Sequence, residues 1–386
     1  MIKSNQIIEK SKCIVIKIGT ALVAERDGTG LKNAWLSALA QDVSTLVSKG
    51  KNVVIVSSGA VALGRKAMGI GLNMPPSSIP LEMKQAASAV GQYHLFDGYH
   101  KAFAQESLPL AQVLITMSET ENRRMHLNAR ATLQALMARG IIPVINENDT
   151  ISTGEIRFGD NDRLAARVAQ MIEADTVLLL STTDGLYTAN PDTDPQAVHI
   201  PYVSVIDDTH LGMAGDAIAG LSTGGMKSKI EAAMTATRSG IHMIIANGCM
   251  PHALGGLMSK SAPRSTVFQA QGTIRNARKR WIGAHLRPKG IVILDDGAVS
   301  ALKSGKSLLP IGVKSIEGDF ERGDIVEIKN LAGKKLGMGI SAYAAGDALK
   351  IIGQKSDALE GILGYVGRQE LIHRNDMALD FYGDSQ

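Results

Sequence analysis

Two segments that combine lysine with glycine could hold a phosphate group. One segment is a glycine pair that leads into a predicted helix start: Thr223, Gly224, Gly225, Met226, Lys227, Ser228 and Lys229. Free backbone N–H groups and the partial positive charge at a helix start favour an anion there. In the other segment, Lys17 ends an apolar run and Gly19 follows. A lysine at a strand end is usually only solvated. Lys17 therefore indicates a site only in combination with the other polar segments described below.

Polar side chains follow three further apolar runs. Ser58 precedes a predicted helix, where it could bind a carboxylate or simply cap that helix. The segment 146–149 begins with Asn146 and ends with Asp149, and it holds more polar groups than a turn requires. Ser181 and Thr182 begin a segment whose composition is typical of nucleotide base and ribose pockets, although an Asp-Gly turn is the simpler interpretation.

A second acidic segment precedes the helix that we expect to begin at Asp162. Asp160, Asn161 and Asp162 follow Gly159 directly. Capping of the helix could account for Asp160 or for Asp162. It does not account for both carboxylates with Asn161 between them.

The elements that must position these residues alternate between short apolar runs and longer segments of helical period. Strands are expected at 13–18, 52–56, 108–115, 141–145, 176–180 and 242–246, and helices at 34–48, 83–104, 123–138 and 162–171. This order predicts an α/β layer fold with a parallel sheet covered on both faces. In such sheets ligands bind beyond the carboxyl ends of the strands, where the polar residues lie.

The residue pattern of the chain changes after Arg280. Short β-like pieces with glycines are expected at 290–294, 312–316, 324–329 and 337–341. A length of 386 residues favours two domains. We therefore predict a first domain over 1–274, a linker over 275–287 and a small β-rich domain over 288–386.

Composition limits the class of protein. Hydrophobic residues make up 45% and charged residues 20% of the chain, which is typical of a globular protein. No apolar run approaches the roughly 20 residues of a membrane helix, and residues 1–12 lack the pattern of a secretory signal, so a cytoplasmic protein is expected. Cys13 and Cys249 have no partners at metal-ligand spacing, which argues against a disulfide framework and against a metal cluster.

Six segments taken together resemble the glutamate 5-kinases of the amino-acid kinase superfamily. They are Lys17-Ile-Gly-Thr, Val56-Ser-Ser-Gly-Ala, Val144-Ile-Asn-Glu-Asn-Asp, Gly159-Asp-Asn-Asp, Gly185-Leu-Tyr-Thr and Ser222-Thr-Gly-Gly-Met-Lys-Ser-Lys. The part from Pro288 to about Ile372, which includes Ser307-Leu-Leu-Pro-Ile-Gly-Val-Lys, is similar to a PUA domain. The resemblance covers nearly the whole chain.

The resemblance implies a three-layer αβα sandwich around a mainly parallel sheet, followed by a small β-rich PUA-like domain. It implies ATP as co-substrate with Mg²⁺ on the phosphates, and phosphorylation of the L-glutamate side-chain carboxylate to L-glutamyl 5-phosphate, the first step of proline biosynthesis. Members of this family are commonly inhibited by L-proline. A homo-oligomer, either a dimer or a tetramer, is also expected.

Residue by residue, the resemblance assigns Lys17 and Lys229 to the transferring phosphoryl group, with Asp162 orienting both lysines. The residues expected to hold glutamate are Ser58, Asn146, Asp149 and Asn161. The residues expected on the nucleotide are Lys17, Ser181, Thr182, Thr223, Gly224, Gly225, Met226, Lys227, Ser228 and Lys229. Many relatives have Asp where this chain has Thr182, so one carboxylate is missing from the nucleotide contacts that the resemblance implies. A glutamate side chain, with a pKa near 4.3, is already ionised at neutral pH, so Asp162 is not needed as a general base.

Two kinds of rival function remain open. Within the same fold, acetylglutamate kinase, aspartokinase and uridylate kinase are alternatives. From another class, a PUA domain suggests an RNA-binding protein. Residues 287–386 contain 13 Lys and Arg against 14 Asp and Glu, whereas nucleic-acid surfaces are usually basic. An RNA partner is therefore not expected.

Overall fold

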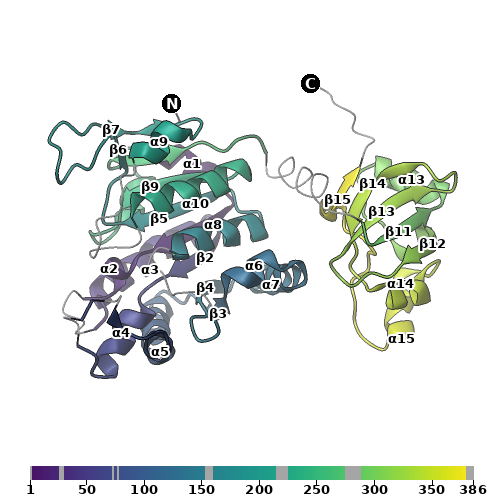
Figure 1. Cartoon of the computed structure of the whole chain (residues 1–386), viewed down its shortest axis with the longest axis horizontal. Coiled ribbons are helices and arrows are strands. Elements are labelled where there is room, and N and C mark those ends of the chain that lie inside the picture. The colour runs from purple at the N-terminus through teal and green to yellow at the C-terminus, as the bar shows by residue number, and fades with distance from the viewer. Residues whose placement is uncertain are drawn as a thin grey trace. The chain divides into compact units, whose positions relative to one another are not determined.

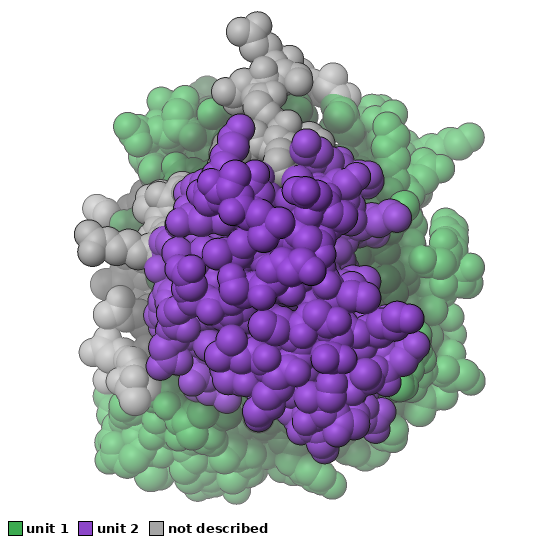
Figure 2. All heavy atoms as spheres, turned by 90° about the vertical axis from the view of Figure 1, so that its right-hand side faces the viewer, with its two compact units in different colours: residues 1–122, 128–273 green, residues 123–127, 274–386 purple. Residues whose placement is uncertain are grey.

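The chain divides into two compact units (Figure 1 and Figure 2). The computed structural model describes residues 2–25, 30–71, 74–75, 78–152, 160–213, 225–273 and 288–379, without the side chains of Arg123 and Asp160. The first unit comprises Met1–Asn122 and Asn128–Thr273, and the second comprises Arg123–Leu127 and Ile274–Gln386. The predicted linker 275–287 lies outside the described residues, so its bounds stay a prediction.

The first unit contains an eight-stranded sheet in the order β3-β4-β2-β1-β5-β9-β10-β8. Its strands are β1 (Cys13–Ile18), β2 (Asn52–Ser57), β3 (Leu110–Ile115), β4 (Ile142–Glu147), β5 (Thr176–Ser181), β8 (Tyr202–Val203), β9 (His242–Asn247) and β10 (Ser265–Phe268). The strands from β3 to β9 are parallel, whereas β10 is antiparallel to β9. A separate pair joins β6 (Leu186–Tyr187) and β7 (His199–Ile200). The six predicted strands and the mainly parallel sheet are confirmed, while β8 and β10 were not predicted.

Helices pack on both faces of this sheet, which makes it the middle layer of an αβα sandwich (Figure 1). The helices are α1 (Ser4–Lys10), α2 (Thr20–Val23), α3 (Asn33–Ser48), α4 (Ala60–Ala67), α5 (Leu81–Ala104), α6 (Met117–Glu121), α7 (Arg123–Met137), α8 (Asp160–Ile172), α9 (Asp208–Met213), α10 (Met226–Arg238) and α11 (Ala253–Met258). The predicted helices are present, but α8 begins two residues earlier than expected. Asp162 is therefore the third residue of α8 and does not cap it.

Burial of β1 on both faces explains its almost uninterrupted apolar sequence. Ile14, Ile16 and Ile18 belong to a core cluster that also contains side chains of α3, α5 and α11. Because successive side chains of a strand point to opposite faces, Lys17 lies on the other face. The helix that contacts β1 there is α8. The strand thus directs one lysine toward the start of α8.

Two glycines allow α4 and α5 to approach each other very closely. A Cβ atom on Gly64 would lie 1.7 Å from the carbonyl oxygen of Ala87, and one on Gly91 would lie 1.8 Å from that of Ala60. Real Cβ atoms do not approach other atoms so closely. Only glycine fits at both positions, which fixes the place of α5 against α4.

The second unit is built on a five-stranded sheet in the order β12-β11-β13-β14-β15. Its strands are β11 (Gly290–Leu294), β12 (Val313–Gly318), β13 (Ile325–Asn330), β14 (Lys335–Ile340) and β15 (Met377–Leu379), and its helices are α13 (Asp296–Lys303), η2 (Pro310–Gly312), α14 (Ala345–Ile351), η3 (Ser356–Ala358), α15 (Leu359–Leu363) and η4 (Arg374–Asp376). Val292, Leu294, Val326 and Ile328 contribute to its own apolar core. The predicted β-rich character is confirmed, although β15 was not predicted. Among the described residues of either unit, no helix is both long and apolar enough to cross a bilayer.

Candidate active site

The predicted site residues meet where the parallel strands end. Lys17 is the next-to-last residue of β1, and Asn146 is the next-to-last residue of β4. Ser58 follows β2 directly, and Ser181 is the last residue of β5. Since these four strands are parallel and adjacent, their carboxyl ends share one edge of the sheet.

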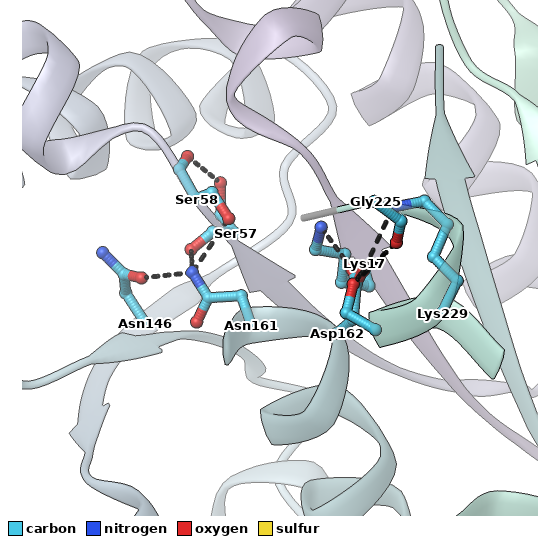
Figure 3. A network of polar contacts seen from close by, with 9 residues as sticks. Lys17, Ser57, Ser58, Asn146, Asn161, Asp162, Gly225 and Lys229 are labelled. Atoms are coloured by element: carbon cyan, nitrogen blue, oxygen red, sulfur yellow. Dashed lines mark hydrogen bonds and ion pairs between the residues drawn. The ribbon is translucent and has the colours of Figure 1, made fainter. Parts of the chain in front are cut away.

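Three charged side chains form a buried group that we call the charged cluster: Lys17, Asp162 and Lys229. The Lys17 ammonium lies 2.5 Å from Oδ1 of Asp162, and the Lys229 ammonium lies 3.1 Å from Oδ2 (Figure 3). Exposed fractions are 6% for Lys17, 0% for Asp162 and 7% for Lys229. One carboxylate thus holds two ammonium groups that come from different elements, β1 and α10.

A serine joins the carboxylate of the charged cluster to the start of α10. The Ser228 hydroxyl lies 3.0 Å from Oδ2 of Asp162 and 3.0 Å from the carbonyl oxygen of Gly225. Gly225 is the N-cap residue of α10, so Ser228 and Lys229 both lie in its first turn. The free N–H groups of that turn are therefore next to the charged cluster.

Burial and charge act on the charged cluster in opposite directions. Burial lowers the pKa of Lys17, and the Lys229 ammonium acts in the same direction, while the Asp162 carboxylate opposes both. Burial alone would raise the pKa of Asp162, but the two ammonium groups hold it below its ordinary value. The carboxylate is therefore ionised at neutral pH. With both lysines protonated, the cluster carries one excess positive charge, which suits an anionic ligand.

Neutral side chains form a second group, which we call the amide cluster: Ser57, Ser58, Asn146 and Asn161. The Asn161 amide nitrogen lies 2.8 Å from the Ser58 hydroxyl oxygen, 3.1 Å from Oδ1 of Asn146 and 3.3 Å from the carbonyl oxygen of Ser57. Figure 3 shows this nitrogen turned toward the three acceptors. The Asn161 amide oxygen is buried and has no hydrogen-bond partner among the residues that the structure describes.

The backbone turn after β2 places Ser58 beside the amide cluster. Gly59 is the N-cap residue of α4 and has a φ of 120°, a conformation that favours glycine. A Cβ atom there would also lie 2.9 Å from Cγ2 of Val23. The Ser58 backbone N–H donates to the carbonyl oxygen of Ile18, which ties this turn to the end of β1.

Asp149 lies near the amide cluster in sequence, three residues after Asn146. Its side chain is buried, and Oδ2 accepts a hydrogen bond of 2.6 Å from the hydroxyl of Ser88. The structure therefore places a second carboxylate on the segment that follows β4. Its donor, Ser88, belongs to α5 and was not among the predicted site residues.

Four side chains of α5 make hydrogen bonds to Ser152, Asp149, Asn146 and Ser57, and they were not predicted from the sequence. They are Gln85, Ser88, Gln92 and Tyr99. Their spacing places them along one helix face, which is the only signal the sequence offers. The same spacing is equally typical of a polar face turned to solvent, so it does not by itself predict a site.

The structure brings together only some of the residues that were predicted to contact the nucleotide. Ser181 is half-buried, whereas the side chains of Thr182 and Lys227 are exposed. The carbonyl oxygens of Ser181 and Thr182 accept hydrogen bonds from the Gly248 N–H and the Asn247 amide, at 2.8 and 3.3 Å. Met226 is half-buried at the start of α10. Thr223 and Gly224 lie outside the described residues.

Comparison with known proteins places the chain among kinases. Residues 12–247 match the model of the Amino acid kinase family, and residues 290–363 match that of the PUA domain. A protein named "Glutamate 5-kinase" from a Ruegeria species is 48% identical over 372 residues, which are 96% of this chain and 99% of that protein. The protein of the same name from Roseobacter denitrificans is 50% identical over 95% of this chain and 96% of its own, and the one from Sinorhizobium fredii is 47% identical over 96% and 93%.

Proposed function

The chain belongs to the glutamate 5-kinase family of amino acid kinases, and we propose that it transfers the γ-phosphoryl group of ATP to the side-chain carboxylate of L-glutamate. The products are ADP and L-glutamyl 5-phosphate, and the reaction is the first step of proline biosynthesis. The observation that carries the proposal is the charged cluster, because its excess positive charge lies beside a helix start at the carboxyl edge of the sheet.

The transfer needs positioning and charge stabilisation rather than proton transfer. A carboxylate oxygen of glutamate attacks the γ-phosphorus, and the bond from that phosphorus to the leaving oxygen of ADP breaks. No proton moves, because the glutamate side chain is ionised at neutral pH. Lys17 and Lys229 contact the phosphoryl group as charge moves between its oxygens, and Asp162 holds both ammonium groups in place.

Glutamate is held by the amide cluster and by Asp149 in this proposal. Ser58, Asn146 and Asn161 offer hydroxyl and amide groups suited to a carboxylate and an ammonium. Asp149 supplies the negative charge that a bound ammonium requires when water is removed from it. The hydrogen bonds that join Asn161 to Ser58 and Asn146 support a common role for these three residues.

The nucleotide phosphates lie at the start of α10. Backbone N–H groups there and the partial charge of a 13-residue helix favour anions. Gly225, Met226, Ser228 and Lys229 are at this start, and Thr223, Gly224 and Lys227 belong to the same proposed segment. Ser181 and Thr182 are assigned to the nucleotide from the end of β5, where the exposed Thr182 side chain stands in place of an Asp.

Mg²⁺ fits this site as part of the nucleotide complex. Among the described residues, no group of three or more His, Cys, Asp or Glu side chains is arranged to hold a metal ion. The Asp162 carboxylate already contacts two ammonium groups. Mg²⁺ commonly keeps several waters and binds substrate phosphates, so we assign it to the phosphate oxygens, where it would neutralise charge on ATP.

A coupled assay of ADP release tests the proposal. The full chain is assayed with ATP, Mg²⁺ and, in turn, L-glutamate, N-acetyl-L-glutamate, L-aspartate and UMP. We expect turnover with L-glutamate and little with the other three acceptors. Equal or faster turnover with another acceptor would overturn the substrate assignment, and no ADP release with any of them would overturn the kinase assignment. Addition of L-proline to the glutamate reaction tests the predicted feedback inhibition.

A further inference from the structure

Three side chains on one face of α5 hold the segment that follows β4. The hydrogen bonds run between Gln85 Nε2 and the Ser152 carbonyl oxygen (3.1 Å), Ser88 Oγ and Asp149 Oδ2 (2.6 Å), and Asn146 Nδ2 and Gln92 Oε1 (2.7 Å). The three α5 positions are separated by three and four residues, so they succeed one another along a single face. Two of their partners, Asn146 and Asp149, are residues assigned to glutamate.

Backbone groups at the two ends of the amide cluster fix the orientation of its side-chain amides. The Glu147 backbone N–H donates to Oδ1 of Asn146 over 2.9 Å, and a backbone N–H can only donate. The amide nitrogen of Asn146 must therefore turn the other way, toward the oxygen of Gln92. At the other end, the Ser57 carbonyl can only accept, so the Asn161 nitrogen faces it. A directed chain of bonds thus joins Gln92 to Asn146, Asn161 and Ser58.

The helix that carries Gln92 is itself fixed in position. Gly91, its neighbour, lies in the close contact with α4 where no side chain fits. About two turns further along α5, the buried Tyr99 hydroxyl donates a 2.9 Å hydrogen bond to Oγ of Ser57. These two contacts fix the place of α5 against α4 and β2, and the fixed helix carries the acceptor for the Asn146 amide.

We propose that Gln92 is a positioning residue for glutamate that acts through Asn146, and that Ser88 plays the same part for Asp149. This inference rests on the proposed function. Without the Gln92 oxygen, the buried Asn146 amide nitrogen loses its acceptor. The Asn146 side chain would then either leave that group unpaired or rotate and lose its bonds to Glu147 and Asn161. Either change misplaces the groups that bind glutamate and leaves the charged cluster intact.

The first test is Gln92→Met in the full chain, which removes the acceptor and keeps the length of the side chain. We expect the KM for L-glutamate to rise roughly tenfold, as for one lost buried hydrogen bond, while the KM for ATP changes by less than about twofold. Gln41→Met, at an exposed position of α3, is the matched control and should change neither constant. An unchanged glutamate KM in a folded Gln92→Met protein would overturn the proposal.

A double-mutant cycle then separates action through Asn146 from a general loss of structure. If Gln92 acts through Asn146, adding Gln92→Met to Asn146→Ala should raise the glutamate KM by less than about twofold beyond the single variant. If the increase in glutamate KM in the double variant equals the product of the increases in the two single variants, Gln92 does not act through Asn146. Melting temperatures of all variants report whether the fold is retained.

A second cycle keeps the proposal testable if Gln92→Met fails to fold. Ser88→Ala should raise the glutamate KM in the wild-type background and change it little in Asp149→Asn, because the hydroxyl acts on that carboxylate. Independent effects of these two substitutions would overturn the assignment of Ser88. Wild-type protein that releases no ADP with L-glutamate would refute the proposed function, whereas an active wild type with independent effects would refute this inference alone.

Discussion

The charged cluster and the amide cluster lie side by side and are built in opposite ways. In the charged cluster, three side chains satisfy one another through ion pairs between Asp162 and two lysines. In the amide cluster, every group depends on the direction of a neutral hydrogen bond, and the chain of bonds extends outward to α5. Ion pairs of this kind hold one another in place with few further contacts. Neutral groups need additional hydrogen-bonded residues around them to fix their orientation.

The two clusters meet in the first turn of α8. Asn161 belongs to the amide cluster, and the next residue, Asp162, belongs to the charged cluster (Figure 3). Consecutive helix residues differ in direction by about 100°, so neighbours in sequence can serve two different sites. In the proposed function, this turn of α8 therefore connects substrate recognition with phosphoryl transfer.

The largest effect is expected from Asp162→Asn, which leaves two buried ammonium groups without their carboxylate. Breaking a buried ion pair on one side typically costs about 3–5 kcal/mol, and we expect a loss of that order in the free energy of unfolding, together with loss of activity. Chemical denaturation of both proteins measures it. Asp97→Asn is the matched control, since it removes a carboxylate from an exposed ion pair with Lys101 and should barely change stability. A variant as stable as wild type would mean that the lysines do not need Asp162.

The free energy of unfolding at acidic pH provides a second test of the Asp162 carboxylate. The folded-state pKa of Asp162 is lowered, so the stabilisation from its charge is present above the unfolded pKa near 3.9 and is lost as the pH falls toward the folded value. Wild type should therefore lose more stability than Asp162→Asn over that acidic range.

Lys229→Ala should lower turnover strongly while leaving glutamate binding nearly unchanged. Its ammonium is needed most as charge develops in the transition state, and loss of one such group typically costs about 10²–10³ in kcat. Steady-state kinetics with varied L-glutamate measure kcat and KM separately. Lys49→Ala, at an exposed position after α3, should behave as wild type. If kcat stays near normal in Lys229→Ala, Lys229 does not belong to the catalytic group.

Asp149→Asn should have the opposite effect to Lys229→Ala, because it should change the KM for glutamate more than it changes kcat. The substituted amide can no longer balance the ammonium of glutamate, so KM should rise by an amount equivalent to about 1.5–3 kcal/mol, the value of one charge-assisted hydrogen bond. N-acetyl-L-glutamate has no ammonium, so its KM should change less and the gap between the two substrates should narrow. Equal effects on both substrates would show that Asp149 does not bind the ammonium group.

The alkaline side of the pH profile should affect turnover before it affects the fold. Burial lowers the pKa of Lys17, so its ammonium loses its proton at a lower pH than an ordinary lysine, and kcat should fall there. The unfolded chain binds that proton more tightly than the folded chain, so deprotonation of Lys17 does not reduce stability as the pH rises. Saturating kinetics and thermal melts over the same pH range compare the two. A fall in kcat that simply follows unfolding would contradict the prediction.

The smallest effect is expected from removal of Ile274–Gln386, which is most of the second unit. Both clusters are made only from residues of the first unit, so a protein that ends after Thr273 should retain kcat and KM close to those of the full chain. Size-exclusion chromatography and the ADP assay check this expectation. A monodisperse but inactive truncation would show that the catalytic half needs residues beyond 273, and would then count against the predicted domain bounds.

The sequence allowed the charged cluster to be predicted more fully than the amide cluster. Lys17 and Lys229 stand out because each follows or begins an element that is easy to recognise, a fully apolar strand and a glycine-led helix. The same reasoning placed Ser58 and Asn146 at strand ends. It misjudged the start of α8, because Asp160 and Asp162, two positions apart, were both reasonable caps.

The support from α5 could not be predicted because it depends on tertiary contact. Gln92 and Ser88 occupy a helix face that also contains small residues, and nothing local shows whether that face meets solvent or another segment. Their partners lie 54 and 61 residues away in sequence. The short strand β10, which pairs antiparallel to β9, was not predicted for a related reason. Its four residues form too short a pattern to be recognised in the sequence.

The position of Asn161 and Asp162 on one helical turn has a consequence for selectivity at saturation. In the proposed function, a substrate that binds Asn161 well would also fix the turn that carries Asp162, and thereby the alignment of both lysines. Binding energy from the non-reacting end of the amino acid can in this way lower the barrier to transfer. A poorly fitting amino acid is then disfavoured twice, first by weak binding and again by slow transfer once bound. Raising its concentration corrects only the first of these.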